Sequence, residues 1–92
     1  MGLTSLHYAC FGSLAPEGLD LLLAAGADVH ARELSGSTPL HYAVQMRSLE
    51  KVRKLIGQRA DVNVQNGKGK SPLDLARKCE PVLKLLQHAG AN

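Results

Sequence analysis

A short phrase that recurs three times at a nearly constant interval constrains the fold of this chain more than any other feature. Residues 36–43 read Gly-Ser-Thr-Pro-Leu-His-Tyr-Ala. Residues 2–9 read Gly-Leu-Thr-Ser-Leu-His-Tyr-Ala, and residues 69–76 read Gly-Lys-Ser-Pro-Leu-Asp-Leu-Ala. Self-similarity at a period of 33 to 34 residues predicts a row of similar units, in which each unit buries its apolar face against its neighbours.

A second phrase keeps the same interval. Residues 26–29 read Gly-Ala-Asp-Val, residues 59–62 read Arg-Ala-Asp-Val, and the last three residues read Gly-Ala-Asn. The two phrases together divide the chain into three units, approximately residues 2–34, 35–67 and 68–92.

The first half of the middle unit has the pattern of a short capped helix. Thr38 is a good N-cap residue, and Pro39 suits the first helical position. The apolar residues Leu40, Ala43 and Val44 follow at helical spacing and define a buried stripe. We expect the corresponding leucines and alanines of all three units to be buried, namely Leu6, Leu40, Leu73, Ala9, Ala43 and Ala76.

The second half of the unit predicts another helix and a tight turn. Ser48 precedes a segment that carries Val52, Leu55 and Ile56 on one face. The dipeptide Asn66-Gly67 is a strong turn signal. Each unit is therefore predicted as helix, turn, helix and hairpin. By the same reasoning the second helices of the first and third units begin at Pro16 and Pro81.

The phrase Thr-Pro-Leu-His-x-Ala, at this period, resembles the core of the ankyrin repeat. The resemblance covers residues 1–92 as a single domain. It implies an all-α repeat solenoid, in which stacked helix-turn-helix units are joined by β-hairpin fingers. A free-standing helical bundle is the alternative, but a bundle gives no reason for turn and capping phrases at fixed intervals.

The two ends of the predicted stack differ. The third unit is shortened and carries polar residues that suit a C-terminal cap facing water, namely Arg77, Lys78, Lys84, Gln87 and His88. The first unit lacks a preceding hairpin and offers apolar residues around its surface, namely Leu3, Leu14, Leu19 and Leu21. We therefore expect the chain to be cut from a longer protein with further repeats at this end, or to self-associate there.

The histidines of the repeated phrase are the first candidates for catalysis or metal binding. The resemblance implies a structural role instead, in which His7 or His41 hydrogen-bonds with Thr4 or Thr38 and ties the helix start to the hairpin. Asp74 occupies the same position in the third phrase, where it can serve as a similar acceptor.

The two cysteines predict free thiols. Cys10 aligns with a core position, whereas Cys79 is expected near the surface. Helix layers step by roughly 8–10 Å, so thiols in the first and last units are too far apart for a disulfide. Free thiols and the absence of a visible signal sequence favour an intracellular protein, cytoplasmic or nuclear.

No other pattern predicts an enzyme. His7 and Cys10 lie one helical turn apart, but no second ligand pair has zinc-site spacing. Residues 67–71, Gly-Lys-Gly-Lys-Ser, look like the end of a phosphate-binding loop, but Val64 stands where that loop requires glycine. We therefore predict no catalytic residue, cofactor, metal or small-molecule substrate. The sequence also lacks an apolar run long enough for a membrane span.

Charge divides the chain into unlike halves. Residues 1–46 hold one base and four acids, a net charge of −3, whereas residues 47–92 hold ten bases and four acids, a net charge of +6. The bases include Lys51, Arg53 and Lys54 on a predicted second helix, Lys68 and Lys70 at a finger tip, and Arg77 and Lys78 at the end of an inner helix. This half either keeps the domain soluble or attracts an acidic partner surface.

The resemblance implies a protein-binding module whose partner lies in a concave groove of finger tips and inner helices. Carried over by position, the predicted contact residues are Phe11, Arg32, Glu33, Leu34, Ser35, Ser37, Gln45, Met46, Asn66, Lys68, Lys70 and Lys78, with Gly12, Gly67 and Cys79 beside them. One alternative is an accessory or autoinhibitory segment of a larger enzyme or channel. The other is a basic surface for nucleic acid or acidic lipid. Nucleic acid is the weaker of these two ligands, because the basic half lacks aromatic residues on which bases could stack.

Overall fold

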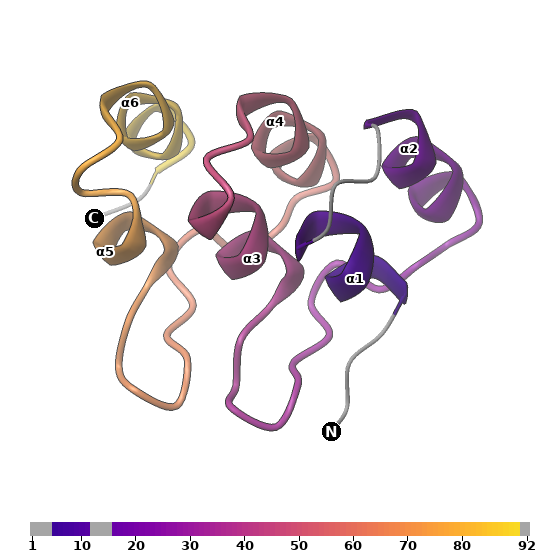
Figure 1. Cartoon of the computed structure of the whole chain (residues 1–92), viewed down its shortest axis with the longest axis horizontal. Coiled ribbons are helices and arrows are strands. Elements are labelled where there is room, and N and C mark those ends of the chain that lie inside the picture. The colour runs from indigo at the N-terminus through magenta and orange to yellow at the C-terminus, as the bar shows by residue number, and fades with distance from the viewer. Residues whose placement is uncertain (1–4, 12–15, 91–92) are drawn as a thin grey trace.

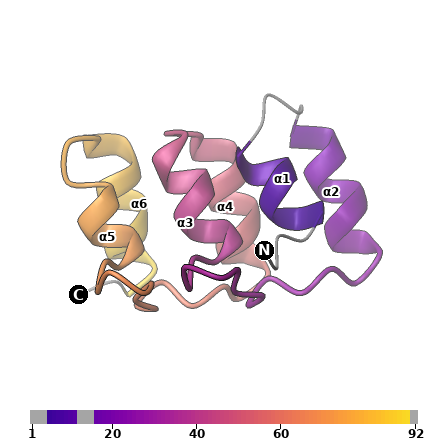
Figure 2. The ribbon, with the colours of Figure 1, turned by 60° about the horizontal axis from the view of Figure 1, so that its bottom comes forward.

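Three stacked pairs of helices make up the described part of the chain in a computed structural model, which covers residues 5–11 and 16–90 (Figure 1). The inner helices α1, α3 and α5 form one row, the outer helices α2, α4 and α6 form a second row, and long loops project beyond the inner row. Figure 2 shows the three pairs side by side in chain order. The helices are α1 (Ser5–Phe11), α2 (Pro16–Ala24), α3 (Pro39–Gln45), α4 (Leu49–Gly57), α5 (Pro72–Leu75) and α6 (Glu80–His88).

The predicted helix starts are confirmed where the structure describes them. The side chains of Thr38, Ser48 and Ser71 each accept a hydrogen bond from a backbone N–H of the first turn of α3, α4 and α5. Helix α2 begins at Pro16 as predicted. Helix α6 begins one residue before Pro81, which takes the second helical position. The predicted cap Thr4 lies outside the described residues.

The core runs as a continuous layer between the two rows of helices. Its fully buried apolar side chains come from all three pairs and include Leu6, Ala9, Cys10, Leu19, Leu40, Ala43, Val44, Val52, Leu55, Ala76, Val82 and Leu86. Leu73 was also predicted to be buried, but it is only half-buried. Its helix α5 packs against α3 and α6, and no further pair of helices follows it among the described residues.

The apolar surface predicted for the first unit is smaller than expected. Leu19 is fully buried on the inner side of α2, so its prediction as a surface residue is wrong, whereas Leu21 is 74% exposed. Leu3 and Leu14 lie outside the described residues.

The projecting loops are fingers closed by backbone hydrogen bonds, and no β-strand occurs in residues 5–11 or 16–90. In the first finger (residues 33–37) the N–H of Glu33 donates to the carbonyl of Ser37 at 3.0 Å. In the second finger (residues 66–70) the N–H of Asn66 donates to the carbonyl of Lys70 at 2.9 Å. The predicted β-hairpins are therefore tight turns. Each is closed by backbone hydrogen bonds like those between paired strands, but the bonded residues are too few to form β-strands.

The two fingers also touch each other. The N–H of Gly67 donates to the carbonyl of Ser35 at 2.7 Å, and the guanidinium of Arg32 donates to the carbonyls of Gly36 and Gln65. These bonds fix the spacing between neighbouring fingers.

His41 has the predicted structural role and one further role, whereas Thr4, the partner predicted for His7, lies outside the described residues. His41 Nδ1 accepts from the N–H of Thr38 at 3.0 Å, and Nε2 donates to the carbonyl of Lys70, in the next finger, at 2.9 Å. His7 Nε2 makes the equivalent bond to the carbonyl of Ser37 at 3.0 Å. Each imidazole therefore ties its own unit to the following one, which the sequence alone did not show.

Asp74 behaves as predicted for the third phrase. Its carboxylate accepts from the N–H of Ser71 at 2.9 Å and from the hydroxyl at 3.1 Å. An ionised carboxylate cannot donate a hydrogen bond to a carbonyl. Asp74 therefore caps its own helix as His41 does, but it cannot make the bond by which His41 reaches the carbonyl of the next finger.

Both cysteines are free thiols. Burial raises the pKa of the Cys10 thiol to about 12, so this side chain is an inert part of the core. None of the described helices is both long and apolar enough to cross a membrane.

Candidate binding face

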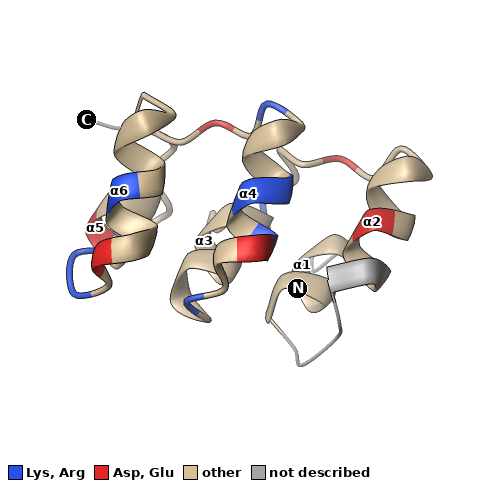
Figure 3. Cartoon of the chain, turned by 90° about the horizontal axis from the view of Figure 1, so that it is seen from above, with Lys and Arg blue, Asp and Glu red and all other residues tan. Residues whose placement is uncertain are grey.

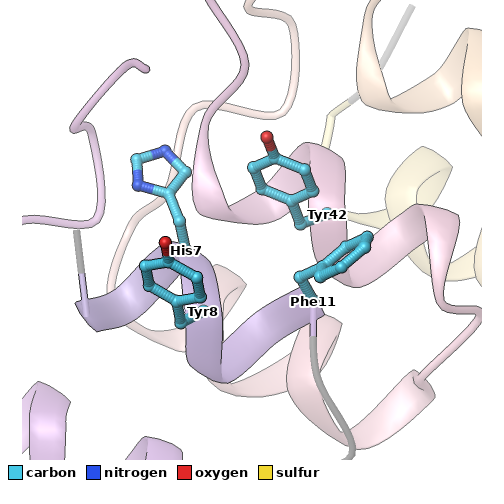
Figure 4. Close-up of a pocket in the computed structure, with 4 residues that line it drawn as sticks. All are labelled: His7, Tyr8, Phe11 and Tyr42. Carbon is cyan, nitrogen blue, oxygen red and sulfur yellow. The ribbon is translucent and has the colours of Figure 1, made fainter. Parts of the chain in front are cut away.

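An open hollow between α1 and α3 is lined by aromatic side chains (Figure 4). Its volume is about 290 Å³, and it is lined by His7, Tyr8, Phe11 and Tyr42, which we call the aromatic pocket. The chain contains only three Phe, Tyr and Trp residues in total, and all three line this one hollow. A chain with so few aromatic residues has thus concentrated them at one place on the inner row of helices.

Tyr42 holds the rings of the aromatic pocket in place. Its ring meets the ring of His7 and the ring of Phe11 edge-on, with both pairs of ring centroids 5.5 Å apart. Edge-to-face pairs of this kind are favourable because the positive edge of one ring meets the negative face of another. Since His7 is fully buried and bonded to the first finger, the back wall of the pocket is rigid.

The front of the pocket remains open to solvent. Tyr8 is 60% exposed and Phe11 is 54% exposed, although both are large side chains. Exposed aromatic residues that flank a hollow are typical of contact sites, because they bury a large area when a partner arrives.

A carboxylate from the first finger stands beside the pocket. Tyr42 donates its hydroxyl to Glu33 Oε2 at 2.9 Å, and Glu33 Oε1 accepts from the hydroxyl of Ser35 and from the N–H of Ser37. These bonds, led by the one from Ser35, lower the pKa of Glu33 to about 2. Burial and the bond to Glu33 raise the pKa of Tyr42, so its hydroxyl stays a donor.

The other predicted residues of the first finger differ in what they can offer a partner. Leu34 is 82% exposed and available to a partner, whereas Ser35 is exposed but its hydroxyl is bonded to Glu33. Arg32 is exposed, but its guanidinium is bonded to finger carbonyls. Ser37 is buried, and its backbone bonds to Glu33 and His7, so we leave it out of the candidate face.

The second finger presents a basic tip. Lys68 and Lys70 are exposed. Asn66 is half-buried, and its side-chain oxygen accepts from the N–H groups of Lys68 and Lys70 at 2.9 and 3.1 Å. Asn66 therefore shapes the finger, whereas the two lysines project from it.

Two of the remaining predicted residues lie at the far end of the inner helix α3. Gln45 ends α3 and Met46 caps it, and both are exposed. Lys78 is exposed in the loop between α5 and α6, so its predicted place on an inner helix is wrong, because α5 ends at Leu75. Gly12 lies outside the described residues.

The basic half is less open than its net charge suggests. Figure 3 shows Lys and Arg on α4, on α6 and in the loop between α5 and α6, with an acidic residue on α2. Lys51 is buried, Lys54 pairs with Asp20 of α2 at 2.7 Å, and Arg77 pairs with Asp74 at 3.1 Å. The bases are thus spread over different faces, and several already have partners within the chain.

Within residues 5–11 and 16–90 no group of three or more His, Cys, Asp and Glu residues could hold a metal ion. The buried histidines each have a carbonyl partner, and the described residues that line the pocket include no nucleophile paired with a base. What the face offers is shape, aromatic surface and charge, which suit binding.

Tyr8 and Tyr42 are the site residues that sequence reasoning missed. They occupy the same position of the repeated phrase, directly after the histidine. The signal was present in the sequence, because Tyr8 and Phe11 lie three residues apart and therefore share one face of a helix.

Comparison with known proteins agrees with this architecture. A family profile described as ankyrin repeats in three copies matches residues 6–92. The chain is 38% identical over 71 residues to a putative ankyrin repeat protein of Acanthamoeba polyphaga mimivirus, covering 77% of this chain and 17% of that protein. It is 41% identical over 75 residues to human protein phosphatase 1 regulatory subunit 27, covering 80% of this chain and 47% of that protein.

A plant protein of a different kind also matches. The chain is 37% identical over 76 residues to a potassium channel of Arabidopsis thaliana, covering 78% of this chain and 9% of the channel. The chain thus spans less than half the length of each of these relatives. On the profile match, the identities and the stacked helix pairs, the chain belongs to the ankyrin repeat family.

Proposed function

We propose that this chain binds a protein partner on the face formed by its inner helices and fingers, and that the aromatic pocket anchors the partner. Ankyrin repeats are in general protein–protein interaction modules, and one relative is named as a regulatory subunit of a phosphatase. The observation that carries the proposal is the gathering of all three aromatic residues of the chain around one open hollow.

The exposure of the pocket supports this assignment. Tyr8 and Phe11 keep more than half of their surface in water, whereas Leu6, the one leucine of the same helix α1, is buried. Interface energy concentrates in a few aromatic anchors that fill or line a pocket, and neighbouring contacts mainly exclude water. The rigid back wall adds to this, because a pre-formed pocket costs little ordering when the partner binds.

The charges of the second finger support a steering role. Lys68 and Lys70 are both exposed in the second finger. Exposed rim charges raise the association rate of an oppositely charged partner more than they raise affinity. A partner with acidic groups opposite this finger is therefore part of the proposal.

Site-directed photocrosslinking tests the proposed face. In one version of the purified chain, p-benzoylphenylalanine replaces Phe11, and in a matched version it replaces Leu21, which is 74% exposed on the outer helix α2. Each is irradiated in an extract of the source cells, with and without excess unlabelled chain. We expect a protein adduct at position 11 that the unlabelled chain competes away, and none of that size at position 21.

A second experiment measures the pocket's contribution. Phe11→Ser should weaken binding to the captured protein about tenfold or more, whereas Leu21→Ser should leave the affinity within about twofold. Both residues are exposed, so both variants should keep the melting temperature within a few degrees. Competed adducts only at position 21, or unchanged affinity in Phe11→Ser, would contradict the proposed face.

A second candidate function is a segment that contacts other parts of its own, longer chain. The match to a potassium channel, of which the aligned region is 9%, favours this candidate. The same photocrosslinking distinguishes the two in a full-length protein, because an internal contact gives an adduct within one chain, which dilution and unlabelled competitor leave unchanged.

A further inference from the structure

We propose that the aromatic pocket receives a basic side chain of the partner, an arginine, with Glu33 as its counter-charge. This inference rests on the proposed function and names the chemistry of the residue that the pocket holds.

The pocket has an acidic residue beside it and no basic side chain among its described lining residues. None of the side chains that line the hollow in the described part of the chain is Lys or Arg. The carboxylate of Glu33 lies 2.9 Å from the hydroxyl of Tyr42, which is one of the lining residues. The finger bonds that lower the pKa of Glu33 to about 2 keep it ionised at every physiological pH.

The nearest base of the same finger is occupied. The guanidinium of Arg32 donates to the carbonyls of Gly36 and Gln65, so it binds the two fingers together. Glu33 instead accepts from neutral donors, namely the hydroxyls of Ser35 and Tyr42 and the backbone N–H groups of Ser35 and Ser37. The pocket therefore has a fixed anion at its side, and no ion pair within residues 5–11 and 16–90 neutralises it.

Aromatic walls beside an anion favour a cation over an apolar group. A cation near a ring face is attracted by the negative face of the ring, and Arg does this more often than Lys because its flat guanidinium also stacks. An apolar occupant would instead cover the Glu33 carboxylate and supply no bond, which is unfavourable for a charged group. The aliphatic stem of an arginine can still pack against Phe11.

The chain's own composition makes a direct test simple. Because the chain holds only two tyrosines, one phenylalanine and no tryptophan, the carbon-bound aromatic protons come from the pocket rings and from three further histidines, which makes the proton NMR spectrum simple to assign. The probe is N-acetyl-arginine methylamide, titrated into the intact chain at low salt. Two matched probes are the citrulline analogue, which has the same shape without charge, and the norleucine analogue, which is apolar.

We expect the arginine probe to shift the ring protons of Tyr8, Phe11 and Tyr42, with a dissociation constant on the order of millimolar, as suits a fragment of this size. The citrulline and norleucine probes should bind roughly threefold to tenfold more weakly, the range of an exposed cation–aromatic contact and a nearby charge.

Two variants locate the effect. Glu33→Gln keeps a hydrogen-bond acceptor for the finger and removes the charge. The affinity of this variant for the arginine probe should therefore fall close to its affinity for the citrulline probe. Glu50→Gln, which removes an exposed acid from the outer helix α4, should change nothing. Tyr8→Leu keeps apolar volume at an exposed position without its aromatic face, and it should weaken the arginine probe selectively.

Norleucine binding as tightly as arginine, an unchanged arginine affinity in Glu33→Gln, or no ring shift with any probe would each overturn this inference. None of these results would touch the proposed function, which depends on the crosslink at position 11. Conversely, arginine binding without a competed adduct at that position would support the pocket chemistry and contradict the protein-binding face.

Discussion

The contact between the two fingers depends on two residues that have no side chain. Gly36 has a φ of +82°, which favours glycine, and a Cβ added there would lie 2.8 Å from the backbone nitrogen of Gly67. A Cβ added to Gly67 would lie 2.8 Å from the carbonyl oxygen of Ser35, the atom that its own N–H bonds. Backbone meets backbone here, and neither side can move away as a flexible side chain would.

Gly36→Ala should therefore lower the free energy of unfolding by roughly 1–3 kcal/mol, from backbone strain and from the loss of contact between fingers. Gly69→Ala is the matched control, because Gly69 has a similar φ of +74° but open space around its Cβ position. Urea denaturation of both variants separates the two causes. Equal losses in the two variants would mean that the finger contact contributes nothing.

His41 gives the stack a dependence on pH. Its Nδ1 must be unprotonated to accept from Thr38, while Nε2 donates to the Lys70 carbonyl. Burial is the main cause that lowers the pKa of His41 below its ordinary value of 6.5. Below pH 6.5, and down to the lowered pKa, the unfolded chain binds more protons than the folded chain. Stability should therefore be complete above pH 6.5 and fall as the pH drops through this window.

Urea denaturation at pH 7.5, 6.5 and 5.5 should show this loss, and the proton resonances of the His41 ring should titrate below pH 6.5. His41→Asn lacks the titrating group, so its stability should be lower at pH 7.5 but should change less with pH. A pH slope as steep as that of the original chain would assign the effect to other groups.

At the scale of the helices, the outer helices end in the same way with different residues. Gly26 and Gly90 follow α2 and α6 with positive φ, and Arg59 takes the same place after α4 with a φ of +63°. The N–H of Arg59 donates to the carbonyl of Ile56 at 2.9 Å, which completes a common helix-ending motif. An arginine adopts this backbone conformation at a cost that a glycine avoids.

Arg59→Gly should therefore raise the free energy of unfolding by about 0.5–1 kcal/mol, the left-handed cost less the entropy cost of a glycine. Arg53→Gly is the opposite control. Arg53 is exposed to solvent in the middle of the same helix, so a glycine there should lower the free energy of unfolding by about 1 kcal/mol. Thermal unfolding of both variants gives the comparison. A lower melting temperature for Arg59→Gly would show that its side chain contributes more than its backbone costs.

At the scale of the whole molecule, stability is shared along a row of three units. The helices contact their own partner and the next pair in line, so the middle unit is the one with a neighbour on each side in the described structure. Leu40 and Leu73 hold the same position of the repeated phrase, but Leu40 is fully buried and Leu73 is half-buried.

Leu40→Ala should lower the free energy of unfolding by roughly 2–5 kcal/mol, because it leaves a cavity where both neighbouring units pack. Leu73→Ala should lower the free energy of unfolding by less, since part of the Leu73 side chain already lies in water. Calorimetry of the two variants tests this ordering. A larger loss for Leu73→Ala would indicate that the end of the stack, and not its centre, limits stability.

The sequence by itself determined the repeat, its period, and most local starts and turns. Thr38 caps α3, Ser71 caps α5, and Asp74 folds back on Ser71, each within three residues. Such bonds follow from backbone geometry and the identity of near neighbours, so they can be predicted without knowledge of the stack. The burial of Leu40, Ala43 and Val44 on one face of α3 follows from helical spacing in the same way.

Only the tertiary structure decided which residues share a surface. The bond from His41 to the carbonyl of Lys70 spans 29 residues, and the pair between Lys54 and Asp20 spans 34. The pocket joins Tyr8 to Tyr42 across two units. These relations depend on the offset and rotation between neighbouring units, which packing of the whole core sets. A local pattern places each side chain on its own helix, but the stacking brings two helices to one site.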